Sequence, residues 1–255
     1  MDSTTPAHAV HIRAKRRLSP AVIRENVYGY LFLAPWLIGF LGLFLGPALA
    51  SLRFSFTQYD VLSPAKWIGA GNYVKMFTDD NLFYTSLART GYFTLLSVPL
   101  GVIGSMILAI LLNMKVKGTV VFRTLFFMPS LVPLISAVVL WLWLLNPDWG
   151  IVNSALVRIG IKAPAWFADR KWAIPSLVMV GLWGGIGGTR MIIFLAGLQG
   201  IPEEMYDAAS IDGANAWDRI RHVTIPLLSP TIFFNVVLAV IGALQSFQGA
   251  FVATE

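Results

Sequence analysis

The chain has 255 residues, of which 56% are hydrophobic and only 13% are charged, with a formal net charge of +6. Soluble domains carry nearer a quarter charged residues, so this composition indicates a membrane protein. The positive charge does not indicate nucleic-acid binding, because most of the bases lie between apolar runs, where lipid headgroups and membrane topology place them. The absence of cysteine excludes disulfides, thiolate chemistry and Cys-ligated metals.

Long stretches without Asp, Glu, Lys or Arg predict the membrane organisation. A bilayer core needs about 20 consecutive apolar residues as helix, and helix is the form that satisfies the backbone in lipid. We expect an all-α, polytopic membrane helix bundle with about five transmembrane helices, at roughly 28–52, 90–113, 122–145, 172–198 and 226–250. Residues 1–26 are expected to form a basic cytoplasmic tail, and residues 27–255 the transmembrane domain.

The first apolar run has a rival interpretation as a secretory signal peptide, because basic residues precede it and Ala48-Leu49-Ala50 follows. A signal-peptide core is about 7–15 residues long, and this run is longer, which favours a retained span. Lys and Arg are densest between Arg13 and Arg24 and in the 115–123 link, and the 199–222 link adds Arg219 and Arg221; the two longer links hold eight, but these are diluted and accompanied by Asp. This density predicts a cytoplasmic N-terminus, and with it a cytoplasmic position for the segment before the last span.

Arg190 interrupts the fourth hydrophobic segment. Exposure of an arginine to lipid costs at least ~2.5 kcal/mol, so its side chain should reach a water-filled cavity, a partner or the interface. One interpretation ends the span near 190 and lays 191–202 at the interface. The sharper hypothesis places Arg190, beside flexible Gly187 and Gly188, on the pathway of a transported substrate.

A polar segment, EEMYDAASIDGANAWDRIRHVTIP, separates the last two apolar runs. Pro202 suits the first position of a helix, and Gly213 can take the left-handed conformation that ends one. Asn215 is a favourable N-cap for the next helix, with Asp218 three residues on, as in a capping box. The pattern therefore predicts helix, turn, helix.

Small residues at Ala208 and Ala209 distinguish this hairpin from a helix that lies on lipid, which would present a bulky apolar face. Small side chains let another protein approach the backbone closely. The alternative is a solvated connector that packs on the chain's own spans.

At these residues the chain resembles a known family. Asp207-Ala208-Ala209, then Gly213, then Val223-x-Ile225-Pro226 is similar to the signature of ABC-transporter membrane subunits: Glu-Ala-Ala, three residues, Gly, nine residues, Ile-x-Leu-Pro. The spacing matches at every position, with Asp207 in place of the usual Glu. The segments WIGAGNYVKMFTDDNLFYTSLART, FRTLFFMPSLVP and IFLAGLQGIPEEMYDAASIDGA resemble the carbohydrate branch of importer permeases, of the maltose and glycerol-phosphate types.

The resemblance implies a membrane-spanning subunit of a binding-protein-dependent ABC importer. Such a subunit moves a sugar or sugar-like solute across the bacterial or archaeal plasma membrane by ATP-driven alternating access. By the same resemblance, the hairpin at 200–226 is the coupling helix that docks on a cytoplasmic ATPase subunit. The residues expected to contribute to this coupling are Glu204, Asp207, Ala208, Ala209, Asp212, Gly213, Ala214, Arg219 and Pro226.

The implied partners are an ABC ATPase dimer, a second permease subunit that is expected to be a paralogue, an extracytoplasmic solute-binding protein and membrane lipid, with no nucleic acid. No Gly-x-x-x-x-Gly-Lys-Ser/Thr loop occurs in the sequence, so ATP and Mg²⁺ are expected to bind the partner ATPase. We therefore expect no cofactor, no metal and no catalytic residues in this chain, which is not expected to be an enzyme.

Permeases of this kind normally have a sixth core span, preceded by a link that contains Gly-Gly-Pro. The sequence stops at Glu255 before either feature, and we expect a permease domain that is truncated before its last span. A non-transporting membrane scaffold that recruits a cytoplasmic partner through the same hairpin is the alternative function. A secondary transporter would want intramembrane carboxylates for ion coupling, and the uncharged stretches offer none.

Overall fold

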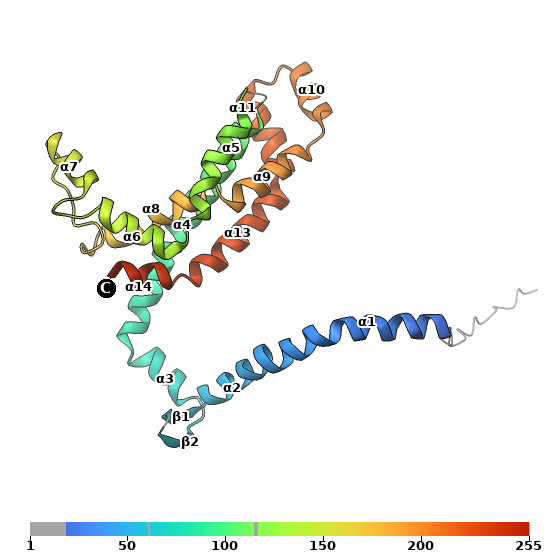
Figure 1. Ribbon diagram of the computed structural model, residues 1–255, viewed down its shortest axis with the longest axis vertical. Coiled ribbons are helices and arrows are strands. Elements are labelled where there is room, and N and C mark those ends of the chain that lie inside the picture. Colours follow the sequence, from blue (N-terminus) through green and yellow to red (C-terminus); the bar gives the residue numbers. More distant parts are fainter. Residues whose placement is uncertain (1–18, 61, 115–116, 255) are drawn as a thin grey trace, which may run out of the picture. The chain divides into compact units, whose positions relative to one another are not determined.

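The computed structural model describes residues 19–60, 62–114 and 117–254, and it divides into two compact units, residues 1–80 and 81–255 (Figure 1). Residues 1–18, which make up most of the expected basic tail, lie outside the described residues, as does Lys115 of the 115–123 link.

The first unit begins with a continuous helical stretch, α1 (Pro20–Gly39), the π-helix η1 (Phe40–Leu45) and α2 (Gly46–Ser55). The Ser19 side chain caps α1 by accepting a hydrogen bond from the Val22 N–H, at 3.4 Å. The expected first span, 28–52, lies inside this stretch. Because α1 begins at Pro20, the last part of the range expected as tail is helical.

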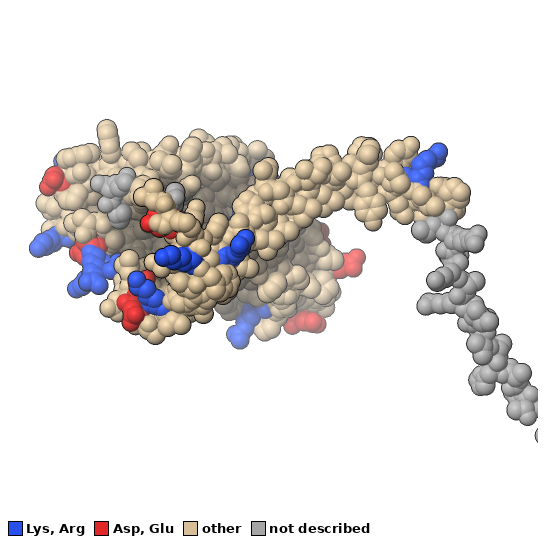
Figure 2. Space-filling view, turned by 90° about the horizontal axis from the view of Figure 1, so that it is seen from below, with Lys and Arg blue, Asp and Glu red and all other residues tan. Residues whose placement is uncertain are grey.

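Large apolar side chains along this stretch are exposed, with Leu43 at 84% and Phe32 at 82%. In Figure 2 this helical stretch is tan along most of its length, with few charged side chains. Monomeric soluble proteins rarely expose so many large apolar side chains together, whereas a surface that contacts lipid requires them.

A short hairpin follows, β1 (Thr57–Asp60) antiparallel to β2 (Ser63–Trp67), and then α3 (Gly71–Thr78). The Asn72 side chain donates to the backbone carbonyls of Ser55 and Thr57, each at 2.9 Å. Within the described residues this hairpin is the one sheet, and it is a local exception to the expected all-helical fold.

The second unit is built around α4 (Asn81–Asn113), which is about 50 Å long from its 33 residues at 1.5 Å per residue. Packed against it are α8 (Ala173–Gly185), α9 (Thr189–Gln199) and α13 (Ser229–Leu244) (Figure 1). The start of α4 lies well before the expected 90–113 span, because a charge-free run marks the apolar part of a helix and not its ends.

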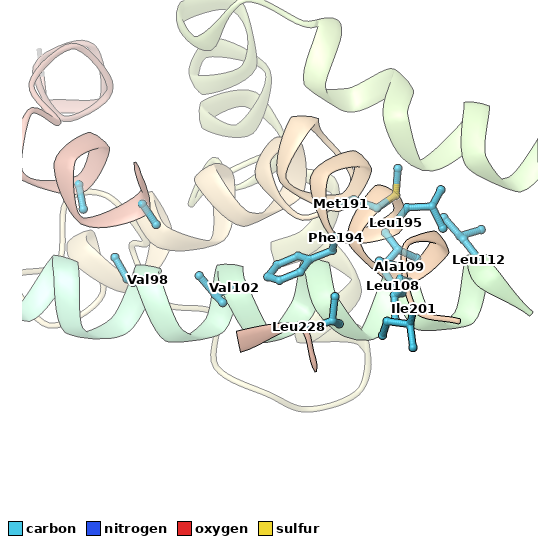
Figure 3. Close-up of a cluster of buried hydrophobic side chains, with 13 residues drawn as sticks. Val98, Val102, Leu108, Ala109, Leu112, Met191, Phe194, Leu195, Ile201 and Leu228 are labelled. Carbon is cyan, nitrogen blue, oxygen red and sulfur yellow. The ribbon is translucent and has the colours of Figure 1, made fainter. Parts of the chain in front are cut away.

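The main core lies where α9 meets α4. Figure 3 shows Met191, Phe194 and Leu195 of α9 close to residues of α4, among them Ala109. Met191, Phe194 and Ala109 have no exposed surface. Fully burying a side chain the size of Phe or Met contributes about 1.5–3 kcal/mol, so this contact fixes α9 firmly on α4.

Three spans are bent. The helices α5 (Thr119–Phe127) and η2 (Met128–Leu131) meet α6 (Leu134–Leu144) at 94°, and α8 meets α9 at 50°. A third bend, of 69°, separates 216–227 from α13. Among the described residues, two helical stretches, Pro20–Ser55 and Asn81–Asn113, are long and apolar enough to cross a membrane alone. Up to five spans, the number expected, result when each bent pair counts as one.

The prediction that the last span, 226–250, ends at residue 250 is wrong. The helix α13 ends at Leu244, and after a turn α14 (Gln248–Thr254) packs against α6. The polar residues Gln245 and Ser246 interrupt the apolar run at this turn, where Ser246 N–H donates to the Ala243 carbonyl. The 146–171 link contains one short helix, α7 (Ile151–Arg158).

Candidate functional site

The polar hairpin consists of α10 (Glu203–Ile211), α11 (Ala216–Arg219), the π-helix η3 (Ile220–Thr224) and α12 (Ile225–Leu227). The predicted helix, turn, helix is confirmed. Pro202 is the N-cap of α10 and not its first helical residue, so the helix begins one residue later than predicted.

The turn has the predicted local chemistry. Gly213 is left-handed, with φ of 80°. Asn215 Oδ1 accepts from the N–H groups of Trp217, at 2.8 Å, and Asp218, at 3.0 Å, while Asp218 Oδ2 accepts from the Asn215 N–H at 3.3 Å. The capping box is therefore complete, and it satisfies backbone donors that a helix start otherwise leaves unpaired.

Side chains hold the two arms of the hairpin together. The hydroxyl of Tyr206 on α10 lies 3.2 Å from the hydroxyl of Thr224 on η3. Thr224 Oγ1 in turn donates to the Arg219 carbonyl at 3.3 Å, and Arg219 Nη1 donates to Ser210 Oγ at 3.4 Å. These bonds make the hairpin one body.

The base of the hairpin is anchored in the core of the second unit. Ile201, before α10, is 8% exposed, and Leu228, after α12, is 1% exposed; both belong to the cluster that contains Phe194 (Figure 3). Leu228 and Thr231 pack closely on Gly197 of α9. A Cβ at Gly197 would lie 2.9 Å from Leu228 Cδ2 and 2.9 Å from Thr231 Oγ1. The base of the hairpin is therefore packed into the same core as α9, α13 and α4.

The far end of the hairpin is exposed. Ala208 is open to solvent and Ala209 is half-buried, and the apolar side chains around them are accessible, with Ile211 at 87%, Trp217 at 66% and Met205 at 46%. In Figure 1, α10 and α11 lie at one end of the second unit and α7 and α14 lie away from them. Exposed apolar residues around small ones, with acidic neighbours, are suited to docking another protein.

The structure brings most of the predicted coupling residues onto this hairpin. Of these residues, Ala209, Ala214 and Arg219 are half-buried, and the others, Glu204, Asp207, Ala208, Asp212, Gly213 and Pro226, are exposed. Pro226 lies apart from the tip, on α12, where the chain returns toward α13. Sequence reasoning missed Trp217, although an isolated tryptophan in a polar segment is a usable signal for a protein interface.

The second predicted site, at Arg190, lies where α8 meets α9. Arg190 is half-buried in the first turn of α9, and its guanidinium reaches α4: a Cβ at Gly101 would collide with Arg190 Nη1. The segment after Arg190 packs in the bundle core, so the interpretation that ends the helical span near 190 does not describe it.

Gly187 and Gly188 are buried and face a different side from Arg190. A Cβ at Gly187 would collide with the carbonyl oxygen of Phe126, and one at Gly188 would lie 3.0 Å from Ser130 Cβ. Both glycines permit close packing of the α8–α9 break on α5 and η2. The cavity that Arg190 lines, of about 190 Å³, includes neither.

A family model described as "Binding-protein-dependent transport system inner membrane component" matches residues 93–252. The chain belongs to this family. A probable ABC transporter permease protein of Bacillus subtilis, YesP, is 37% identical over 93% of this chain and 76% of its own length. The lactose transport system permease protein LacF of Rhizobium radiobacter is 35% identical over 90% of this chain and 77% of its own length.

A solved structure of a bacterial ABC transporter involved in the import of the acidic polysaccharide alginate has the same fold. It is 25% identical, with a TM-score of 0.77, over 91% of this chain and 81% of the matched chain. The family and its relatives confirm the resemblance on which the hairpin was assigned, the polytopic helical fold and a location in the membrane. The chain is a permease, a membrane component of a binding-protein-dependent transport system.

Proposed function

We propose that this permease forms part of the pathway for a sugar or sugar-like solute, which is imported by ATP-driven alternating access. Relatives named for arabinooligosaccharides, for lactose and for trehalose and maltose support a saccharide. The structure of the hairpin is the main support for this mechanism. Its tip is exposed, which suits docking, and its base is buried in the core that joins α4, α9 and α13.

In this proposal the tip of the hairpin docks on a separate ABC ATPase subunit, which binds ATP and Mg²⁺. Ala208 and Ala209 admit the partner close to the α10 backbone, while Ile211 and Trp217 supply apolar contact area. Closure of the ATPase dimer moves the hairpin. Because Tyr206 and Thr224 join its arms and Leu228 lies in the core, the motion reaches the helices that line the pathway.

In this proposal one helix bundle forms only half of the pathway, so the chain needs further partners. We take them to be a second permease subunit, a paralogue, and an extracytoplasmic solute-binding protein, which the description of the family names as a requirement. The N-terminus is placed in the cytoplasm of a bacterium or archaeon because Lys and Arg are dense there, and the hairpin, four crossings later, is placed on the same side.

Arg190 belongs to the pathway in this proposal. It lines a cavity between α4, α8 and α13 together with Ser97 and Ser246, and an arginine in a membrane bundle belongs in a polar cavity. Gly187 and Gly188 contribute indirectly, because their close packing on α5 and η2 holds the break from which α9, and with it Arg190, begins.

The test is the ATPase activity of the complex in proteoliposomes. The permease is assembled with its ATPase, second permease and solute-binding protein, and ATP hydrolysis is measured with and without solute-loaded binding protein. Ala208→Trp places a large side chain on the exposed docking surface, and Ala155→Trp makes the same change on exposed α7. We expect Ala208→Trp to abolish stimulation and Ala155→Trp to retain it.

Full stimulation in a well-folded Ala208→Trp complex would show that the hairpin is not the docking site. Normal recruitment of the ATPase by the unmodified chain, with no stimulation and no uptake, would favour the alternative of a non-transporting scaffold.

A further inference from the structure

Two hollows beside α4 share a wall. The first, of about 290 Å³, is lined by Arg89 and Thr90, and the second, of about 190 Å³, by Ser97 and Arg190. Four residues line both: Phe93, Gly181, Ala243 and Ser246. The two hollows are therefore neighbouring parts of one cavity along α4.

The cavity has an arginine at each end. Arg89 lies on α4 itself, and Arg190 reaches α4 at Gly101. The helical rise of about 1.5 Å per residue puts these two levels about 18 Å apart. Between them lie the hydroxyls of Ser97 and Ser246 and the ring of Phe93. This is enough length for more than one monosaccharide unit.

Among the described residues, no carboxylate on the lining helices neutralises either arginine. The helices that line the cavity, α4, α6, α8, α9, α13 and α14, contain no Asp or Glu. Within the described residues, neither arginine forms an ion pair, and the Ser97 hydroxyl, which is buried, has no hydrogen-bond partner. Arg190 is half-buried and Arg89 is exposed at the other end of the cavity, and with no acidic side chain on the lining helices the two cations create a positive potential along it.

The cavity therefore attracts an anion more strongly than a neutral solute. Arginine presents its N–H groups in a fork that matches a carboxylate, and such charge-assisted bonds are stronger than bonds between neutral groups. Serine hydroxyls suit the hydroxyls of a sugar, and an aromatic ring such as Phe93 suits its apolar face. Since the paired arginines are what sets this cavity apart, the charge of the solute is what it selects.

We infer that this cavity recognises a saccharide that carries carboxylate groups, with Arg190 and Arg89 each binding a carboxylate as the chain of sugars passes along α4. This inference rests on the proposed function, which supplies the pathway, and adds the chemical class of the solute. A neutral saccharide would leave both arginines without a counter-charge.

The absence of cysteine from the sequence allows a direct test of the potential. Ser97→Cys places one thiol in the cavity, and Ser86→Cys places one on an exposed part of α4 outside it. In membranes that contain the complete complex, with and without ATP, each thiol is labelled by an anionic sulfonatoethyl and by a cationic trimethylammonioethyl methanethiosulfonate. The ratio of the two labelling rates is compared with the ratio at the Ser86→Cys control.

We expect the anionic reagent to be favoured at position 97 by on the order of tenfold relative to the control, as an unscreened nearby charge predicts. Arg190→Gln should remove most of this preference and leave the Ser86→Cys ratio unchanged. Galacturonate, but not galactose at the same concentration, should slow labelling at position 97, and Arg190→Gln should abolish that protection.

Equal ratios at the two positions would overturn the inference, because they would mean that a partner's acidic group neutralises the arginines. Equal protection by galactose and galacturonate, protection by neither, or no labelling in either nucleotide state would overturn it as well. Failure of the proposed function would give a different result. In that case no ATPase would copurify with the permease, and copurification is measured on the same membranes.

Discussion

The hydroxyl of Tyr206 lies 3.2 Å from that of Thr224, and this contact joins the two arms of the coupling hairpin across the turn. Tyr206 also packs against the core cluster of the second unit, and Thr224 is 4% exposed. The pair therefore connects the exposed tip to the part of the hairpin that enters the bundle. We infer that this contact transmits the movement of the docked tip to α9 and α13.

Tyr206→Phe should weaken the connection between the two arms of the hairpin without unfolding the chain. The loss of one hydrogen bond costs about 0.5–1.5 kcal/mol, and Thr224 keeps its bond to the Arg219 carbonyl, so no buried hydroxyl is left unpaired. We expect a small fall in melting temperature and a larger fall in ATP hydrolysis stimulated by the binding protein than in basal hydrolysis. Tyr30→Phe, at a side chain that is 70% exposed, is the control. Unchanged stimulation in Tyr206→Phe would show that the bond does not transmit docking.

Asn215→Ala removes the side-chain half of the capping box of α11. Loss of an Asn N-cap costs about 1 kcal/mol, because the N–H groups of Trp217 and Asp218 lose their acceptor, while Asp218 can still accept from the backbone N–H of residue 215. We expect the ATPase to dissociate from the permease more readily and the hairpin to be cleaved faster by protease, while Asn215→Ser retains both properties. Proteolysis at the same rate in the Ala and Ser variants would contradict the role assigned to this cap.

Gly187→Ala should destabilise the break between α8 and α9. The new Cβ meets the backbone carbonyl of Phe126, which cannot move aside as a flexible side chain would, and overpacking of this kind costs about 1–3 kcal/mol. Gly185→Ala is the matched control, since nothing lies within 4 Å of a Cβ there. Thermal unfolding of the purified complex should separate the two variants; equal melting temperatures would mean that α5 does not pack as described.

Gly101→Ala should displace the side chain of Arg190 and leave the backbone in place. Its Cβ collides with Arg190 Nη1, the far end of a flexible side chain, so Arg190 should move while the helix keeps its stability. We expect uptake of the solute to fall several-fold with a melting temperature close to that of the parent. Gly91→Ala, on the same helix with nothing within 4 Å, should change neither property. Normal uptake in Gly101→Ala would show that the position of Arg190 is not important for transport.

The hairpin could be predicted from sequence because its structure is local. The left-handed turn at Gly213 and the capping box of Asn215 and Asp218 depend on neighbouring residues, and the structure contains both. The bends at η2 and at Leu228 could not be predicted, because prolines in membrane helices are compatible with straight and with broken spans. The early end of α13 was missed for a similar reason: hydropathy averages over Gln245 and Ser246.

The cavity could be predicted only in part. Arg190 is conspicuous in the sequence because it interrupts an apolar run, but its partners come from helices far away along the chain. Gly101 and Ser97 are ordinary in α4, and Arg89 precedes the apolar stretch, so no local pattern connects them with Arg190. Only packing of α4 against α8, α9 and α13 places them along one cavity.

The central claim is that the hairpin docks on an ABC ATPase, and a single cysteine tests it most directly. Ala209→Cys places the one thiol of the chain on α10, and a short thiol-directed crosslinker is applied to native membranes, with Ala155→Cys on α7 as the control. The account predicts that Ala209→Cys captures an ABC ATPase subunit, identified by mass spectrometry, and that Ala155→Cys captures none. A well-expressed Ala209→Cys chain, assembled with its second permease, that captures no ATPase would contradict the account.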